Sequence, residues 1–305
     1  MPSRKKLNSP PSNPNKTKKI LKKLFNKKVT ENTSAKSSER RQETISPEDR
    51  ALLQKVKLRM PSTLDILEET VRILQSKASN LVNSDFIRSN FSTSLIEFEK
   101  VVFEIYLKHQ KTMFLSLIDE WVAWYSKKLE EIATTLGPQG FAKRVCRDFY
   151  PLAQRLEFEA GQMRKSRGGH TFEEIVGFLL KRIGVPNEKP KDKNAIKLKN
   201  IDRVIPNPEV ALQTPDKALF LSCKRTLRER WKQAASERNP TWRVFVITID
   251  ITLPESKADE ANRLGMIVYV RDELKELKHL KKKTWVRKLT DFPKDLKEFG
   301  FPRNR

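Results

Sequence analysis

The sequence predicts an α/β fold in which a mainly helical region precedes a central mixed sheet flanked by helices. Apolar residues recur at helical spacing between residues 48 and 160, and four short apolar, largely β-branched runs follow in the second half. Stretches with helical spacing lie before and between those runs. At 305 residues and 37% hydrophobic content, the chain is long enough for one large or two ordinary cores.

The first 47 residues read as a disordered basic tail. They carry thirteen Lys or Arg and three Glu, a net charge of +10, with Pro, Ser and Asn throughout. Low hydrophobicity combined with high charge predicts disorder. The segment KKILKKLFNKKV within it suits a short amphipathic helix that binds DNA nonspecifically, and it equally suits a solvated tail.

Residues 48–160 are expected to form a helical region for DNA binding and dimerisation. Ser46, followed by Pro-Glu-Asp, is a helix start signal, with a capping residue, a proline and then two acids. Ser62 and Asp65 have capping-box spacing, which predicts a second start. Further helical faces follow until Gly137-Pro138 interrupts them.

Residues 161–305 are expected to form the α/β core. A helix is predicted to start at Thr171, and another to run from 227 to 237. Four strands are expected, at 201–206, 218–224, 244–249 and 266–270.

The formal charge of +24 indicates a polyanionic partner, because lysine and arginine arrays displace counterions from phosphates. No apolar run is long enough to span a membrane, and no secretory signal is evident. Cys146 and Cys223 are expected to be reduced thiols of a cytoplasmic protein. The three histidines lie far apart without C-x-x-C partners, which argues against a zinc site.

A set of residues suited to phosphodiester hydrolysis occurs in the second half. It comprises Glu173 or Glu174 on a helix, Asp202 on a strand, Lys224 at a strand end and Glu237 on the next helix. Carboxylate oxygens bind Mg²⁺, and a nearby lysine can orient or deprotonate the attacking water. Each residue alone also has a structural explanation, such as a cap or a surface acid. The interpretation as a nuclease site therefore depends on the order of all four residues along the chain.

Four features carry a resemblance to a known family: RKSRGGHTFEE, IDRVIP, LSCKRTLRERW, and Glu237 thirteen residues beyond Lys224. Together they resemble the PD-(D/E)XK core of type II restriction endonucleases, in the branch that contains EcoRII, SsoII, PspGI and NgoMIV. The resemblance covers roughly residues 161–240. Ser222 stands where the common pattern has an acid, and in this branch an acid on the following helix replaces it.

The resemblance implies roles for these residues. Asp202 and Glu237 would bind the metal, Lys224 would activate water, and Glu173 would be an adjacent or second-metal carboxylate, with Glu174 as the alternative. Arg228, Glu229 and Arg230 would read G·C pairs in the major groove, although an exposed turn with an internal ion pair is the alternative. Lys165 and Arg167 in RKSR would bind phosphates together with glycine amides, unless they form a solvated basic turn.

The implied protein is a homodimeric prokaryotic type II restriction endonuclease with Mg²⁺ as cofactor. It would cut double-stranded DNA at a palindrome such as CCNGG or CCWGG, CCGG being less favoured, with a cognate DNA cytosine methyltransferase as functional partner. Relatives that read such sites extrude the central base, for which Phe91, Phe98, Phe103 and Tyr106 are conceivable platforms, although each also fits a helix core. The alternatives are a repair nuclease or resolvase of the same fold, and a noncatalytic nucleic-acid-binding protein.

Overall fold

The computed structural model describes residues 45–227 and 242–300. The predicted basic tail therefore lies almost wholly outside the described residues. The predicted base-reading and metal-binding positions Arg228, Glu229, Arg230 and Glu237 lie outside them too. Pro47–Arg305 form one compact unit.

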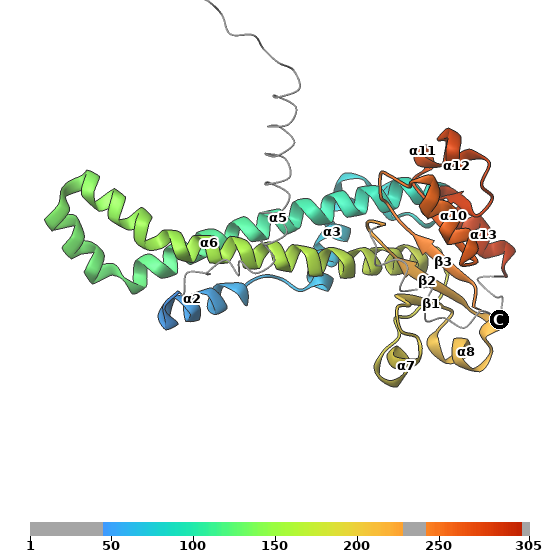
Figure 1. The fold of residues 1–305 in the computed structure, drawn as a ribbon, viewed down its shortest axis with the longest axis horizontal. Coiled ribbons are helices and arrows are strands. Elements are labelled where there is room, and N and C mark those ends of the chain that lie inside the picture. The colour runs from blue at the N-terminus through green and yellow to red at the C-terminus, as the bar shows by residue number, and fades with distance from the viewer. Residues whose placement is uncertain (1–44, 228–241, 301–305) are drawn as a thin grey trace, which may run out of the picture. The chain divides into compact units, whose positions relative to one another are not determined.

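Six helices make up the first part of this unit: α2 (Pro47–Lys57), α3 (Thr63–Lys77), η1 (Ser79–Val82), α4 (Ser84–Ser89), α5 (Phe91–Trp124) and α6 (Ser126–Arg182). Both predicted start signals are confirmed. Pro47 begins α2, and the Ser62 hydroxyl accepts the Asp65 amide at 3.2 Å while the Asp65 carboxylate accepts the Ser62 amide at 2.8 Å. The long helices α5 and α6 lie side by side (Figure 1).

Helix α6 contradicts two expectations. The chain kinks at Gly137, where φ is 63°, but it is helical through Thr171, which the sequence had predicted as a helix start. The Thr171 hydroxyl bonds back to the Arg167 carbonyl at 2.7 Å instead of capping a new helix. The expected division at 160/161 also falls inside this helix, so the helical region and the sheet region share an element.

The sheet contains five strands in the order β1-β2-β3-β4-β5. Their bounds are β1 (Arg203–Ile205), β2 (Leu219–Cys223), β3 (Val244–Ile247), β4 (Met266–Val270) and β5 (Val286–Lys288). β1 pairs antiparallel with β2, and the later pairs are parallel, so the sheet is mixed as expected. The four predicted strands are confirmed, whereas the three-residue β5 was not predicted.

Both faces of the central strands are covered, which explains why β2 and β3 are buried at every position. On one face, Phe220 and Val246 join the aliphatic core. On the other, Phe245 and Tyr269 pack against Phe292, which in turn contacts Phe91 of α5. Helix α5 is therefore packed onto the sheet region through aromatic contacts.

Short elements connect and flank the strands. They are α7 (Asp192–Lys197), α8 (Pro208–Gln213), η2 (Pro215–Lys217), α10 (Glu255–Arg263), α11 (Asp272–Lys275), α12 (Lys278–Lys281), η4 (Leu289–Asp291) and α13 (Phe292–Glu298). Within the described ranges, no helix is long and apolar enough to cross a membrane. Cys146 and Cys223 are free thiols, the first exposed and the second buried.

Candidate active site

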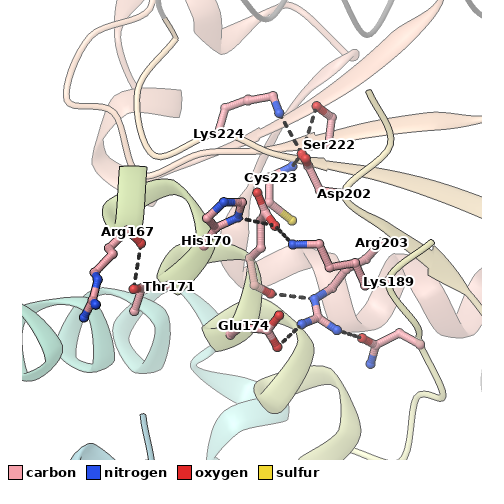
Figure 2. Close-up of polar contacts among 12 residues, drawn as sticks. Arg167, His170, Thr171, Glu174, Lys189, Asp202, Arg203, Ser222, Cys223 and Lys224 are labelled. Carbon is pink, nitrogen blue, oxygen red and sulfur yellow. Dashed lines mark hydrogen bonds and ion pairs between the residues drawn. The ribbon is translucent and has the colours of Figure 1, made fainter. Parts of the chain in front are cut away.

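The β1–β2 pair brings Asp202 and Lys224 together. The Asp202 amide donates to the Leu221 carbonyl at 2.9 Å, which fixes the residue beside β2. Its Oδ2 then accepts the Lys224 ammonium at 2.7 Å and the Cys223 amide at 2.6 Å (Figure 2). Because the Lys224 amide donates to the Ile247 carbonyl at 2.8 Å, the lysine is held where β2 leaves the sheet.

Ser222 lies on the same side of β2 as Lys224. Its hydroxyl is 3.5 Å from Asp202 Oδ2, and the residue is buried. The strand alternation predicted from the sequence therefore places Ser222 and Lys224 at one carboxylate. The serine adds a weak neutral contact and no negative charge.

The electrostatics of Asp202 link it to Glu173. Burial raises the pKa of the Asp202 carboxyl, the Lys224 ammonium opposes that shift, and the negative charge of Glu173 adds to it. The two carboxylates are therefore close enough to interact. None of the described residues hydrogen-bonds to Oδ1 of Asp202, so that oxygen is available for a ligand.

Glu173 is held by α6 and carries its own cation. Its side chain is only 11% exposed, and its Oε2 accepts the Lys189 ammonium at 2.6 Å. The Nδ1 atom of His170 lies 3.6 Å from the same oxygen. Figure 2 shows Lys189 and His170 approaching this carboxylate from different directions.

The neighbouring Glu174 is engaged elsewhere. Its Oε2 accepts the buried Arg203 guanidinium at 2.5 Å. Arg203 also donates to the Glu173 carbonyl at 2.5 Å and to Asn187 Oδ1 at 3.0 Å (Figure 2). This arrangement favours Glu173 over Glu174 as the acid that faces Asp202, and it makes Arg203 the group that joins β1 to α6.

Three groups in or beside the site were not predicted from the sequence. Arg203 had a usable signal, because a charged residue inside an apolar strand must find buried partners. Lys189, in the loop between α6 and α7, had none, because its contact with Glu173 depends on how that loop packs against α6. The ion pair between Glu99 and Arg225 had none either, because it joins segments far apart in the chain. Glu99 is buried on α5, and Arg225 directly follows Lys224.

The structure corrects the setting of the RKSR segment. It lies inside α6 rather than in a turn, so the glycine amides after it belong to a helix and are not presented to phosphates. Arg167 donates to the Pro61 carbonyl, and Arg164 bonds Gln110 and Glu157, each at 2.9 Å. Lys165 is exposed.

Only one of the four conceivable base platforms is accessible. Phe91, Phe98 and Tyr106 are buried, as their alternative role in the helix core requires. Phe103 is 43% exposed, and the Arg225 guanidinium lies 5.8 Å from its ring centroid.

The oxygen donors suit a hard divalent cation such as Mg²⁺. Asp202 and Glu173 are each paired with a lysine through one oxygen, Oδ2 and Oε2 respectively, and none of the described residues hydrogen-bonds to the other oxygen of either carboxylate. Within the described ranges, no group of three or more His, Cys, Asp or Glu side chains is arranged to hold a metal. A complete site therefore needs a further ligand, and Glu237, the expected one, lies outside the described residues.

The five-stranded mixed sheet with its flanking helices is the PD-(D/E)XK nuclease fold, with the N-terminal helical region that was expected. The resemblance read from the sequence is confirmed by comparison with known proteins. The chain is 27% identical over 210 residues to the type II restriction enzyme SsoII of Shigella sonnei, a match that covers 65% of each chain. The similarity thus spans 65% of that relative's length. No family model matches.

Two solved structures, of Ecl18kI and of the restriction endonuclease PspGI, share the fold. Ecl18kI, metal-depleted and in complex with uncleaved DNA, superposes with a TM-score of 0.71 at 21% identity, covering 86% of this chain and 88% of that one. PspGI in complex with substrate DNA gives a TM-score of 0.55 at 21% identity, covering 79% of this chain and 93% of that one.

Proposed function

We propose that this protein is a type II restriction endonuclease that hydrolyses both strands of DNA with Mg²⁺. The observation that carries the proposal is the convergence of Asp202 and Lys224 at 2.7 Å, at the end of β2 in a sheet of restriction-nuclease topology. The net charge of +24 provides the attraction for a polyanionic substrate.

The side chains divide the chemistry between them. Asp202 and Glu237 would hold the ion, which when bound stabilises negative charge on the reacting phosphate. Lys224 would orient the attacking water or accept its proton. Glu173 is the third carboxylate of the constellation, and its negative charge adds to the rise that burial causes in the pKa of Asp202.

Site recognition is assigned to Arg228, Glu229 and Arg230, which follow the described turn at residues 224–227. Arginine forks pair with guanine and a carboxylate accepts from cytosine, so we assign a palindrome of CC and GG steps, CCNGG or CCWGG. If the middle base is extruded, Phe103 is the accessible ring near Lys224, because Arg225 contacts it.

A homodimer follows from two-fold symmetry, because each half of a palindrome needs its own active site. Leu107, Leu115 and Val122 are exposed on α5 and fall within one face of the helix. This face is a candidate for the dimer surface. Sedimentation equilibrium should show more monomer for Leu115→Asp, whereas Leu58→Asp, at an exposed position after α2, should match the wild type.

A plasmid nicking assay separates the nuclease from a noncatalytic binder. The wild type should relax and linearise unmethylated plasmid with Mg²⁺ but not with EDTA, and Lys224→Ala should bind DNA without cutting it. Salt-sensitive binding with no Mg²⁺-dependent cutting would favour the binder. Protection of the plasmid by a cognate cytosine methyltransferase would further support restriction.

A repair nuclease or resolvase of the same fold is the second alternative. Glu229→Ala discriminates, since a base-reading carboxylate predicts relaxed sequence preference. An equal loss of cutting on all sequences would reject the base-reading role.

A further inference from the structure

Arg225 directly follows Lys224 and was not among the expected site residues. Its Nε atom forms an ion pair with Oε1 of Glu99 on α5. The guanidinium also lies 5.8 Å from the ring centroid of Phe103, one helical turn further along α5. A carboxylate and an aromatic ring therefore fix the orientation of this guanidinium beside the proposed active site.

The two terminal nitrogens of this guanidinium remain available. The Arg225 side chain is 42% exposed, and its Nη1 and Nη2 atoms donate no hydrogen bond to any residue that the structure describes. A guanidinium has five N–H donors in a planar fork, which matches the oxygens of a phosphate group. The free edge of Arg225 thus suits a phosphodiester.

Glu99 is a costly residue for the folded protein. Its side chain is only 10% exposed, and its Oε2 has no hydrogen-bond partner among the described residues. Burial raises its pKa to about 7, even though Arg225 opposes the shift. An apolar side chain would avoid this cost, and costly polar groups of this kind are typical of functional sites. The pair is therefore best explained by a task of Arg225.

Helix α6 leaves room next to Arg225. A Cβ atom at Gly168 would lie 3.9 Å from Nη1 of Arg225, and a Cβ atom at Gly169 would meet nothing within 4 Å. Alanine would fit at both positions and would stabilise the helix relative to glycine. Because intramolecular packing does not require these glycines, we interpret the bare helix surface as space for another molecule beside the guanidinium.

The spacing along α6 relates this place to the Asp202 site. Glu173, whose charge acts on Asp202, follows Gly168 by five residues, about 7.5 Å along the helix axis. Successive charges of one DNA strand are about 3.4 Å apart along the duplex axis. A phosphate bound by Arg225 would thus lie on the order of two nucleotides from a phosphate at Asp202.

We propose that Arg225 binds a phosphate of the DNA backbone close to the cleaved phosphodiester, and that Glu99 is the positioning residue that holds its guanidinium. A backbone contact strengthens binding without selecting a sequence. This inference rests on the proposed function and deepens it. It adds a substrate contact between the reacting phosphate and the residues proposed to read bases.

Binding of a random-sequence duplex of about 30 base pairs in EDTA tests this contact apart from cleavage. Fluorescence anisotropy at several KCl concentrations gives Kd and its dependence on salt. Arg225→Gln should raise Kd about tenfold. It should also reduce the slope of log K against log[KCl] by about 0.9, the value for one phosphate contact. Arg225→Lys keeps the charge and should keep most of the slope.

Arg263→Gln is the matched control, because it removes the same charge from an exposed position. Arg263 ends α10 shortly before β4 begins. Since β2, β3 and β4 run parallel, it lies at the opposite edge of the sheet from Lys224. Its salt slope should match that of the wild type.

Glu99→Gln tests the positioning role. Loss of a negative charge should by itself tighten binding to a polyanion. We expect instead that Kd rises about threefold or more, because Arg225 loses its anchor. The same substitution in the Arg225→Gln background should have no further effect, since Glu99 acts through Arg225.

Gly168→Leu tests the space beside the guanidinium. Leucine favours a helix, so the variant should remain folded in urea unfolding experiments. The added side chain should nevertheless raise Kd about tenfold by excluding the DNA backbone. Ser166→Leu, at an exposed position of the same helix, should match the wild type.

A salt slope in Arg225→Gln equal to that of the wild type or of Arg263→Gln would overturn the phosphate contact. Unchanged or tighter binding by Glu99→Gln would overturn its positioning role. If the wild type cuts at one sequence while Arg225→Gln binds like the wild type, the proposed function stands and this inference fails. If Arg225→Gln loses slope as expected but the wild type cuts no DNA, the phosphate contact stands and the proposed function fails.

Discussion

The Lys224 ammonium lies 2.7 Å from Oδ2 of Asp202, although the two residues enter the site from antiparallel strands. The lysine and the backbone amide of Cys223 both bind this one oxygen, and none of the described residues hydrogen-bonds to Oδ1. One carboxylate thus orients the lysine with one oxygen, and the proposed function assigns the other oxygen to a metal. This division of labour underlies the first prediction.

Asp202→Asn should abolish cleavage while preserving the fold. The amide keeps the size of the side chain but loses the charge that holds Lys224 and that the proposed function assigns to the ion, so the cleavage rate should fall at least about 10³-fold. Single-turnover cleavage of a plasmid measures the effect. Asp216→Asn, at an exposed position in η2, is the matched control, and an equal loss in both variants would contradict the assignment.

Gly177→Ala should destabilise the protein strongly. A Cβ atom at this position would overlap Arg203 Cζ, so the guanidinium would have to leave its three acceptors. A buried arginine without its partners costs about 3–5 kcal/mol. Gly169→Ala, in the same helix with nothing within 4 Å, should instead stabilise by about 0.5–1 kcal/mol. Urea unfolding compares them, and similar effects would refute the role of Arg203.

Glu99 should make stability depend on pH. Burial raises its pKa from 4.5 to about 7 despite the ion pair with Arg225. The folded chain therefore holds this proton more tightly than the unfolded chain between these pH values, and its contribution to stability declines as pH rises from about 4.5 to 7. The free energy of unfolding of the wild type relative to Glu99→Gln should fall by up to about 3 kcal/mol over that range.

Denaturant titrations of both proteins at pH 5 and pH 8 measure this difference. A difference that is independent of pH would mean that Glu99 remains ionised throughout. A difference of opposite sign would mean that Arg225 outweighs burial.

Asp250→Ala should impair discrimination between DNA sequences. Its Oδ2 accepts the Leu227 amide at 2.7 Å, and Lys257 donates to the Leu227 carbonyl at 2.6 Å, so both peptide groups of Leu227 are held directly before the residues proposed to read bases. Losing one such bond costs about 1–3 kcal/mol. The ratio of cleavage rates at the cognate site and at single-mismatch sites should drop about tenfold or more. An unchanged ratio would show that this turn does not orient base recognition.

Local signals were sufficient for much of the fold. The capping box of Ser62 and Asp65 and the β-branched runs predicted helix starts and four strands, because each depends on neighbouring residues alone. The prediction that a helix starts at Thr171 was wrong, because a threonine hydroxyl can donate to a carbonyl inside a helix as readily as it can cap a helix start. The strand β5, Val286–Lys288, was not predicted because it has only three residues and is defined by its pairing with β4.

The site was predictable where strand geometry set it. The two-residue periodicity placed Ser222 and Lys224 on one side, and the order of residues suggested Asp202 as their partner. Lys189 and the Glu99–Arg225 pair could not be predicted, because their contacts depend on how a loop and a distant helix pack. These are the groups that set the charge balance around the carboxylates.

Digestion of unmodified phage DNA with Mg²⁺, followed by sequencing of the fragment ends, tests the central claim most directly. Discrete fragments whose ends all fall at one palindrome with CC and GG halves are the expected result. Ends scattered without a common sequence, or intact DNA under conditions in which the protein binds it, would contradict the assignment of a site-specific endonuclease.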